Sequence, residues 1–516
     1  MILKELLEGC GVVNASLPAE REITHVAYDS RKVDEGSLFV AIKGEKYDGH
    51  DFISEAIKKG AKAVVGERDV KTMESTYIRV KDSRKALACI THNFYRMPSE
   101  HLTLIGITGT NGKTTTTYIL KSILECWGKE VGLIGTINYM IKKRTYPAPH
   151  TTPESLEFHG LLREMLLSGC THVISEVSSH ALEQHRVDGA VFKVAVFTNL
   201  TRDHLDFHKT MENYFRAKER LFRELLDKDG TSVINLDDPY GKRLMVEIGS
   251  ASGERDSGDG RILTYGLEKE TDIEAREIYM SSEGIKFKIS FRGRTHDISS
   301  PLMGLPNVYN IMSAVGASIS MGIPWQAILD GIRKTGDVRG RFEKVDLGQG
   351  FICIIDYAHT EDALERLILT ARELIKDLPS SIQPRVITVF GCGGDRDRGK
   401  RARMGAVATG LSDFVILTSD NPRSEEPSDI IQEIEGGAVK SNYIKEPDRR
   451  EAIKRAVGLA CGKDIILIAG KGHEDYQEIK GIRYPFNDRE ILEEVIKNKL
   501  RIQKRNENSG CMEVRK

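Results

Sequence analysis

The chain has 516 residues, of which 40% are hydrophobic and 29% charged, proportions typical of a globular protein of about three domains. Its 75 Lys and Arg residues nearly balance 76 Asp and Glu, and the net charge of -1 argues against binding nucleic acid or an anionic membrane through bulk charge. The eight cysteines are too few and too scattered for a disulfide framework or a CxxC metal site, and no apolar run is long enough to span a bilayer. We therefore expect a cytoplasmic protein without membrane insertion.

The pattern of apolar runs divides the chain into three α/β units. Residues 1–97 alternate short strand-like and helical segments, and a break follows at Arg96 to Ser99. Residues 98–336 begin with a buried strand, a glycine loop and a helix, while residues 337–504 contain near-continuous apolar runs separated by helical stretches. Such runs are typical of a parallel sheet covered on both faces, as in a Rossmann-like domain. The polar residues 505–516 are expected to be a disordered tail.

A glycine-containing loop follows the first strand of the second unit. The segment Gly109-Thr110-Asn111-Gly112-Lys113-Thr114-Thr115 lies between an expected strand, Leu102 to Thr108, and an expected helix, Thr115 to Trp127. A phosphate is bound by backbone N–H groups at a helix N-terminus, a lysine ammonium and a hydroxyl that reaches the metal ion. The loop supplies all of these in order and predicts a nucleotide-binding P-loop.

Three candidates in this unit each have two interpretations from the residues alone. Glu176 follows a buried strand and is suited to hold the magnesium of a nucleotide, or it is a surface glutamate beside a helix N-cap. His204 is suited to a metal or phosphate site, or it is a solvated loop histidine; the glutamate of a zinc HExxH motif is absent, because Leu205 fills that place. Lys218 lies in an amphipathic helix and by itself reads as a surface lysine.

Three loops at strand ends in the third unit combine arginines with acids. They are the segments around Arg396, Asp420 to Arg423, and Gly470 to Glu474. Arginines suit a carboxylate and acids suit an ammonium group, so the combination predicts a site for a zwitterionic amino acid. Each loop taken singly is also explained as a turn with salt-bridging charges.

The motifs GTNGKTT, EVSSHAL, NLTRDHLDFH, DYAH, GCGGDRD, DNPR and GKGHED occur here in an order and spacing that resembles the ATP-dependent Mur ligases of bacterial cell-wall synthesis. The resemblance implies an N-terminal UDP-binding domain, a central P-loop ATPase domain with a mostly parallel sheet, and a C-terminal Rossmann-like domain for the incoming amino acid. It implies an amide ligase that adds meso-2,6-diaminopimelate to the D-glutamate γ-carboxylate of UDP-N-acetylmuramoyl-L-Ala-D-Glu. The reaction would consume ATP with Mg²⁺ and pass through an acyl phosphate, giving ADP and phosphate.

The resemblance also implies roles for particular residues. The catalytic set is Lys113, Glu176, His204 and Lys218, and the metal ligands are Thr114, Glu176, His204 and Lys218 as a carbamate, which turns a cation into an oxygen ligand. ATP contacts beyond the loop are Asn310, Arg341 and Asp356. Contacts to the UDP-muramoyl dipeptide are Ser30, Glu45, Lys46, Tyr47, Thr151, Thr152, Ser178, Gln184 and Arg186. The diaminopimelate contacts are Arg396, Asp420, Asn421, Pro422, Arg423, Gly470 and Glu474.

Several alternatives stay open at this point. Arg423, last in DNPR, favours diaminopimelate over lysine, because lysine has no distal carboxylate; a lysine-adding ligase is the nearest alternative. Folylpolyglutamate synthetase shares the ATPase core but usually lacks a domain ahead of the P-loop. A P-loop kinase or a nucleotide switch would not need the arginine loops of the third unit. We expect a monomer.

Overall fold

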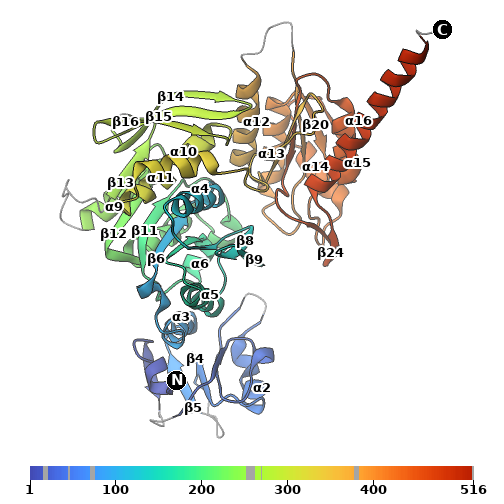
Figure 1. Cartoon of the computed structure of the whole chain (residues 1–516). Coiled ribbons are helices and arrows are strands. Elements are labelled where there is room, and N and C mark those ends of the chain that lie inside the picture. The colour runs from blue at the N-terminus through green and yellow to red at the C-terminus, as the bar shows by residue number, and fades with distance from the viewer. Residues whose placement is uncertain are drawn as a thin grey trace.

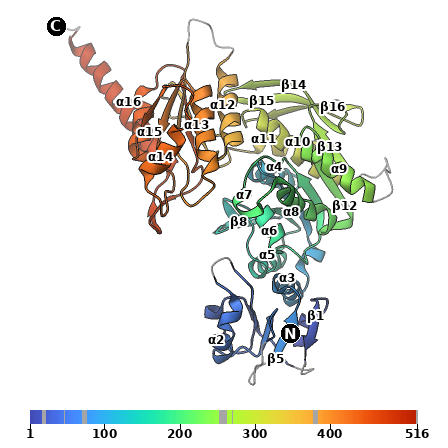
Figure 2. The same ribbon diagram turned by 180° about the vertical axis from the view of Figure 1, so that it is seen from behind.

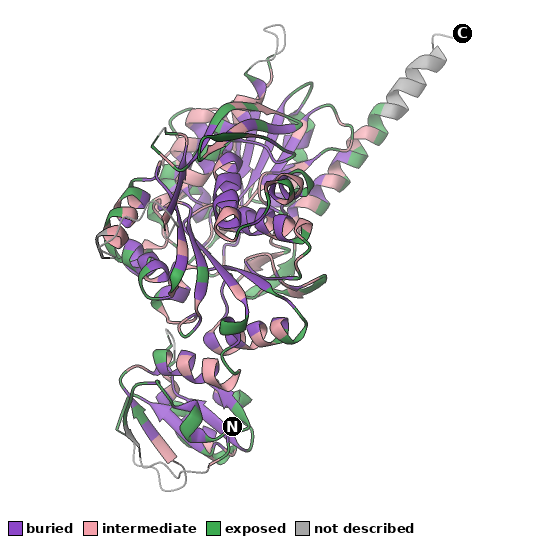
Figure 3. Cartoon of the chain, turned by 60° about the vertical axis from the view of Figure 1, so that its left-hand side comes forward, coloured by how far each residue is buried: buried purple, intermediate pink, exposed green. Residues whose placement is uncertain are grey.

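The structure is a computed structural model that describes residues 1–15, 21–44, 47–69, 76–251, 262–268, 270–376 and 383–513. Three α/β units follow one another along an elongated molecule, with the N-terminal unit at one end and the C-terminal unit at the other (Figure 1). The view from behind shows the same order, with the central unit between the other two (Figure 2). Buried residues concentrate in the sheets and on the helix faces that cover them (Figure 3).

The N-terminal unit contains a five-stranded sheet in the order β1-β5-β4-β3-β2. Its strands are β1 (Val12–Ala15), β2 (His25–Ala27), β3 (Ser37–Val40), β4 (Ala63–Gly66) and β5 (Thr76–Val80), and only β1 pairs antiparallel. Helices α1 (Leu3–Leu6) and α3 (Ser83–Phe94) cover one face and α2 (Ile53–Lys58) the other. Cys10 and Cys89, on the segments after α1 and within α3, are joined as a disulfide.

The central unit is built on an eleven-stranded sheet in the order β16-β15-β14-β13-β12-β11-β6-β10-β7-β8-β9. The strands from β7 to β14 in this order are parallel, and each edge ends in antiparallel pairs. The parallel strands are β6 (Thr103–Thr108), β7 (Val131–Ile134), β10 (His172–Glu176), β11 (Phe192–Phe197), β12 (Leu226–Asn235), β13 (Ile262–Gly266) and β14 (Ile273–Ser281). The edge strands are β8 (Asn138–Ile141), β9 (Arg144–Pro147), β15 (Gly284–Phe291) and β16 (Arg294–Ser300).

Alternation of side chains along these strands makes two cores, one on each face of the sheet. Ile105 and Ile107 of β6 pack with helices α4 (Lys113–Cys126), α10 (Leu305–Ser320) and α11 (Trp325–Lys334). Leu104 contributes to the opposite core, which holds α5 (Ser155–Leu167), α6 (Ser179–Glu183), α8 (Met211–Arg223) and α9 (Pro239–Ala251). The short helix α7 (Leu205–His208) lies between β11 and α8 in the chain.

The C-terminal unit has a six-stranded sheet in the order β17-β18-β22-β19-β20-β21. All its pairs are parallel except that of β17 with β18. The strands are β17 (Glu343–Val345), β18 (Ile352–Asp356), β19 (Val386–Phe390), β20 (Phe414–Leu417), β21 (Tyr443–Lys445) and β22 (Ile465–Ala469). Helices α12 (Glu361–Ile375), α13 (Gly399–Leu411) and α14 (Pro427–Glu435) cover one face, and α15 (Arg449–Leu459) and α16 (Asp488–Glu513) the other.

The C-terminal end of the chain differs from the sequence prediction. Helix α16 continues to Glu513, where a disordered tail was expected over 505–516; only residues 514–516 lie outside the described part. Ile491, Leu492 and Ile496 hold the start of α16 on the sheet, and adding turns to an existing helix costs less free energy than starting one. None of the helices among the described residues combines the length and apolarity that crossing a bilayer requires.

Candidate active site

The predicted P-loop joins β6 to α4, and two of its positions require glycine. Gly109 has φ +147°, and a Cβ there would lie 1.9 Å from Thr198 Oγ1. Gly112 has φ +89°, and a Cβ there would lie 2.4 Å from Asn310 Oδ1. Thr198 and Asn310 therefore pack closely against the loop at these two positions. Helix α4 begins at Lys113, two residues earlier than expected, so its free N–H groups lie at the end of the loop, as in sites that bind phosphate.

Two lysines converge on one carbonyl of the loop. Lys113 Nζ donates to Gly109 O at 2.8 Å and to Thr110 O at 2.8 Å, and Lys218 Nζ donates to Gly109 O at 3.0 Å. Lys218 is 2% exposed and lies over the Tyr214 ring, so it is not the surface lysine that its helix alone indicates. Burial lowers the pKa of Lys113, and burial together with the charge of Lys113 lowers the pKa of Lys218 well below its usual value.

Glu176, the last residue of β10, lies directly beside the loop. It is 0% exposed, so it is not a surface glutamate. Its carboxylate accepts hydrogen bonds from Thr114 Oγ1 at 3.0 Å, Thr136 N at 2.8 Å and Thr136 Oγ1 at 2.9 Å. The adjacent hydroxyl and carboxylate are hard oxygen donors suited to Mg²⁺. Within the described residues no cluster of three or more His, Cys, Asp or Glu side chains is arranged to hold a metal ion.

His204 lies at the edge of this region and has a left-handed backbone, with φ 54°. Its Nε2 is 3.3 Å from Asp203 Oδ2, and its ring centroid is 4.7 Å from that of His180. Burial lowers the pKa of His204 to about 3, although the charge of Asp203 opposes this shift. The imidazole is therefore neutral near pH 7, the form that offers a lone pair to a metal ion or accepts a proton.

The other predicted ATP contacts lie around the same loop. Arg341 Nη2 is 3.4 Å from Thr114 Oγ1, and its guanidinium lies over the Tyr357 ring. Asp356, at the end of β18, accepts hydrogen bonds from Phe342 N and Ala358 N. Burial raises the pKa of the Asp356 carboxyl. The C-terminal unit thus places Arg341 next to the loop of the central unit, while Asp356 bonds to the backbone of Phe342, the residue after Arg341.

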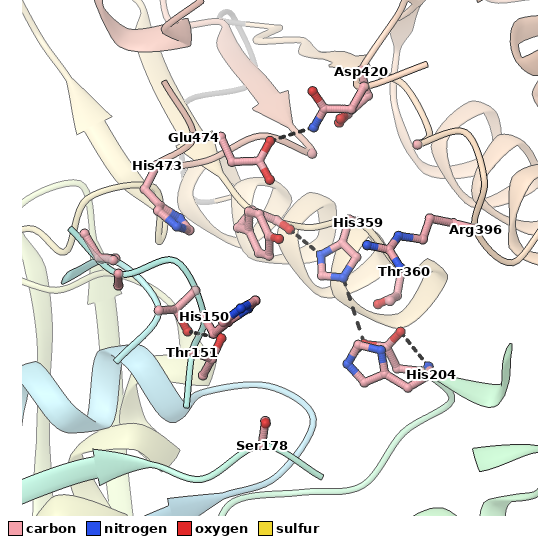
Figure 4. Close-up of a pocket in the computed structure, with 18 of the residues that line it drawn as sticks. His150, Thr151, Ser178, His204, His359, Thr360, Arg396, Asp420, His473 and Glu474 are labelled. Atoms are coloured by element: carbon pink, nitrogen blue, oxygen red, sulfur yellow. Dashed lines mark hydrogen bonds and ion pairs between the residues drawn. The ribbon is translucent and has the colours of Figure 1, made fainter. Parts of the chain in front are cut away.

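A cavity of about 950 Å³ is lined by residues of the central and C-terminal units. In Figure 4 one side carries His150, Thr151, Ser178 and His204, and the other His359, Thr360, Arg396, Asp420, His473 and Glu474. Of the four predicted catalytic residues, His204 lines this cavity; Glu176 and Lys218 are buried, Lys113 is partly buried, and these three do not line it. Thr136, which lines the cavity, donates to Glu176, and Glu176 accepts from Thr114 of the phosphate loop, so the cavity and the loop are connected through these three residues.

The predicted contacts to the UDP-muramoyl dipeptide fall into two groups. Thr151, Thr152, Ser178 and Arg186 line the cavity, and Arg186 donates to Gln184 Oε1 and Thr152 O. Ser30 and Tyr47 belong to the N-terminal unit and do not line it. Tyr47 is 74% exposed, whereas Ser30 is buried. Glu45 and Lys46 lie outside the described residues.

The structure brings the three predicted amino-acid loops together at the carboxyl ends of β19, β20 and β22. Arg396, Asp420, Asn421, Arg423, Gly470 and Glu474 all line the cavity, while Pro422 does not. Arg423 has φ 51°, and its Nη1 donates to Gly394 O at 2.7 Å. Gly470 has φ +112°, and a Cβ there would lie 2.4 Å from Asp420 Oδ2. These loops hold charged side chains at fixed positions around one end of the cavity.

Sequence reasoning missed several side chains in and around the cavity. Asp203 Oδ2 lies 3.9 Å from His359 Nε2, which links the central unit to the C-terminal unit. Lys471 is 0% exposed beneath the cavity. Asp362 accepts hydrogen bonds from Asn111 of the P-loop. Asp203, His359 and Lys471 belong to quoted motifs, but burial and pairing across units carry no signal in the sequence.

Comparison with known proteins identifies the family to which the chain is similar. Family models for the Mur ligase catalytic, middle and glutamate ligase domains match residues 22–95, 107–318 and 340–472. A relative from Clostridium botulinum, UDP-N-acetylmuramoyl-L-alanyl-D-glutamate--2,6-diaminopimelate ligase, is 45% identical over 484 residues, covering 93% of this chain and 96% of its own. The enzyme of the same name from Caldanaerobacter subterraneus is 46% identical over 478 residues, covering 92% of this chain and 95% of its own.

Solved structures of the same family also resemble this fold. A structure of UDP-N-acetylmuramoyl-L-alanyl-D-glutamate--2,6-diaminopimelate ligase has a TM-score of 0.67 at 33% identity and covers 97% of this chain and 99% of its own. A folylpolyglutamate synthase from Thermotoga maritima, with a TM-score of 0.56 at 16% identity, covers 74% of this chain and 89% of its own and shows only a shared fold. The predicted fold class is confirmed, and the chain belongs to the Mur ligase family.

Proposed function

We propose that the protein is an ATP-dependent ligase that joins meso-2,6-diaminopimelate to the D-glutamate γ-carboxylate of UDP-N-acetylmuramoyl-L-Ala-D-Glu in peptidoglycan precursor synthesis. One observation carries the proposal: a single cavity of about 950 Å³ is lined by the predicted dipeptide contacts of the central unit and by the three amino-acid loops. It adjoins the phosphate loop through Thr136, which lines the cavity and hydrogen-bonds to Glu176, the partner of Thr114. The names of the relatives supply the substrates. We place the domain boundaries at 97/98 and 336/337, between the sheets.

The first step is transfer of the ATP γ-phosphoryl group to the γ-carboxylate. The loop N–H groups and Lys113 bind the phosphates and offset the charge that develops on them. Thr114 and Glu176 would hold Mg²⁺, which supplies further charge neutralisation when bound. Thr151, Thr152, Ser178 and Arg186 orient the dipeptide so that its carboxylate faces the phosphate. The products are an acyl phosphate and ADP.

The second step is attack by the amine on the acyl carbon, with release of phosphate. The amine must lose its proton before it attacks; His204, with a pKa of about 3, is too weak a base for this step and is assigned to the metal-binding set. Closure of the C-terminal unit over the central unit excludes water and protects the acyl phosphate. The contacts of Asp203 with His359 and of Asp362 with Asn111 support such a closed arrangement.

The burial of Lys218 supports the carbamate proposed for it. Carbamate formation needs the neutral amine as nucleophile, and burial beside Lys113 lowers the pKa of Lys218 well below its usual value. The carbamate would replace one of two adjacent cations by an anion with oxygen ligands. It would thereby complete the metal-binding set of Thr114, Glu176 and His204.

A ligation assay tests the proposal. The protein is incubated with ATP, Mg²⁺, the UDP-muramoyl dipeptide and either diaminopimelate or lysine, and the product mass and ADP release are measured. We expect an adduct with diaminopimelate and little with lysine. An adduct with lysine alone would assign the lysine-adding reaction, and ADP release independent of any amine would favour a kinase or nucleotide switch. A cytoplasmic location and a monomeric state stay predictions.

A further inference from the structure

Lys471 is a buried cation directly beneath the amino-acid end of the cavity. It follows β22 and Gly470, and its side chain is 0% exposed. Its Nζ donates to Asn421 Oδ1 at 3.1 Å and to Glu474 Oε2 at 3.0 Å. A buried ammonium is costly unless it is paired, so its place beside two predicted substrate contacts requires an explanation.

The two oxygens of Glu474 are used differently. Oε2 accepts from Lys471 Nζ and also from Asn421 Nδ2, at 2.8 Å. Over the described part of the chain, Oε1 receives no hydrogen bond from a protein group. Glu474 lines the cavity, where Figure 4 shows it between His473 and Asp420. Oε2 is thus held by Lys471 and Asn421, whereas Oε1 is available to a ligand.

The electrostatic surroundings of Glu474 oppose its ionisation. Burial raises the pKa of this carboxyl, the charge of Asp420 raises it further, and Lys471 lowers it. The other titratable groups around it are Tyr357, Tyr476, His473 and Arg449. A protonated Glu474 would lose the charge that binds an ammonium group, so the cation beneath it favours the form that the substrate needs.

We propose that Lys471 is a positioning residue for the amino-acid substrate: it keeps Glu474 ionised and turns Oε1 toward the substrate's ammonium group. This inference rests on the proposed function. Lys471 acts through Glu474 and does not itself line the cavity. The alternative is that Lys471 only stabilises the fold of the C-terminal unit.

The test compares Lys471→Met with Lys463→Met. Both lysines flank β22, but Lys463 lies exposed at its other end. In Lys471→Met we expect the KM for diaminopimelate to rise about tenfold to a hundredfold, as for the loss of a charged hydrogen bond, with little change in the KM for ATP. Lys463→Met should match the wild type. An unchanged amine KM in Lys471→Met would overturn the inference.

The pH dependence separates positioning from a structural role. Between about pH 6 and pH 9 the amine KM of Lys471→Met should fall as the pH rises, because Glu474 without its cation ionises only at higher pH. The wild-type amine KM should change less over the same range. If the amine KM of Lys471→Met and that of the wild type changed with pH in the same way, Lys471 would not be what keeps Glu474 ionised.

A double variant covers the case in which Lys471→Met does not fold. Lys471→Met/Glu474→Gln removes both charges, leaves no unpaired buried carboxylate, and is compared with Glu474→Gln alone. If the double variant and Glu474→Gln have the same KM for the amine, Lys471 acts through Glu474. A higher amine KM in the double variant than in Glu474→Gln would contradict this. If the wild type makes no diaminopimelate adduct, the proposed function fails; if the wild type is active and these comparisons fail, only this inference does.

Discussion

The phosphate loop and the amino-acid pocket adjoin one another but are constructed differently. The predicted phosphate site is one contiguous segment, Gly109 to Thr115, in which positions 109 and 112 leave no space for a Cβ. The pocket is assembled from side chains of three loops that are far apart in the sequence. A backbone site binds a feature common to many substrates, the phosphate, while a side-chain site sets which amino acid is accepted.

The two regions also differ in what lies beneath them. At the phosphate loop, the partly buried Lys113 and the buried Lys218 both donate to Gly109 O. Behind the pocket, the fully buried pair of Arg449 and Asp488 has its oxygen and nitrogen 2.7 Å apart, and Arg449 also donates to Ala469 O and Ser419 O at the ends of two strands. The first arrangement places two lysines of lowered pKa at the phosphate loop, while the second fixes the ends of the strands that carry the amino-acid loops.

The largest expected effect lies on the phosphate side. Lys218→Ala should lower kcat by about a thousandfold or more, because it removes the oxygen ligand that the carbamate would give to the metal ion. Added short carboxylic acids should restore part of the activity by replacing the carbamate oxygens. Lys228→Ala, an exposed lysine on β12, is the matched control. Full activity of Lys218→Ala in steady-state assays would exclude the carbamate.

A smaller effect, confined to the amino-acid side, is expected for Arg423→Ala. The KM for diaminopimelate should rise about tenfold to a hundredfold through loss of a charged hydrogen bond to its distal carboxylate. The KM for ATP and the weak reaction with lysine should change little. Arg398→Ala removes an exposed arginine from a neighbouring loop, where it pairs with Glu425, and serves as the control. An equal change in the KM for ATP would show that the two regions are not separate.

The smallest effect tests how the two regions are joined. Asp362, in the first turn of α12, accepts hydrogen bonds from Asn111 Nδ2 and Thr201 Oγ1, both at 3.1 Å. Asp362→Ala should lower kcat/KM for ATP about threefold to tenfold, because two contacts between the units are lost. The control is Glu365→Ala, an exposed acid on the same helix. If Asp362→Ala and Glu365→Ala have the same kcat/KM for ATP, closure of the two units does not depend on the hydrogen bonds of Asp362.

The contrast between the regions also explains what the sequence could predict. The sequence predicts the P-loop because its residues are consecutive and lie between a strand and a helix. It predicts the three amino-acid loops because each follows an apolar run that forms a strand. The helix pattern alone indicates that Lys218 is a surface lysine, since its burial depends on packing against Gly109, which lies 109 residues away in the chain. Lys471, Asp362 and the disulfide of Cys10 with Cys89 likewise depend on contacts between distant segments.

The most direct test of the central claim follows the carboxylate oxygen. The UDP-muramoyl dipeptide is labelled with oxygen-18 in its D-glutamate γ-carboxylate, and the phosphate released during ligation to diaminopimelate is analysed by mass. If the γ-carboxylate attacks ATP and the amine then displaces phosphate, each phosphate released with an amide bond carries a labelled oxygen from that carboxylate. Unlabelled phosphate, formed together with the same amide product, would contradict an acyl-phosphate mechanism.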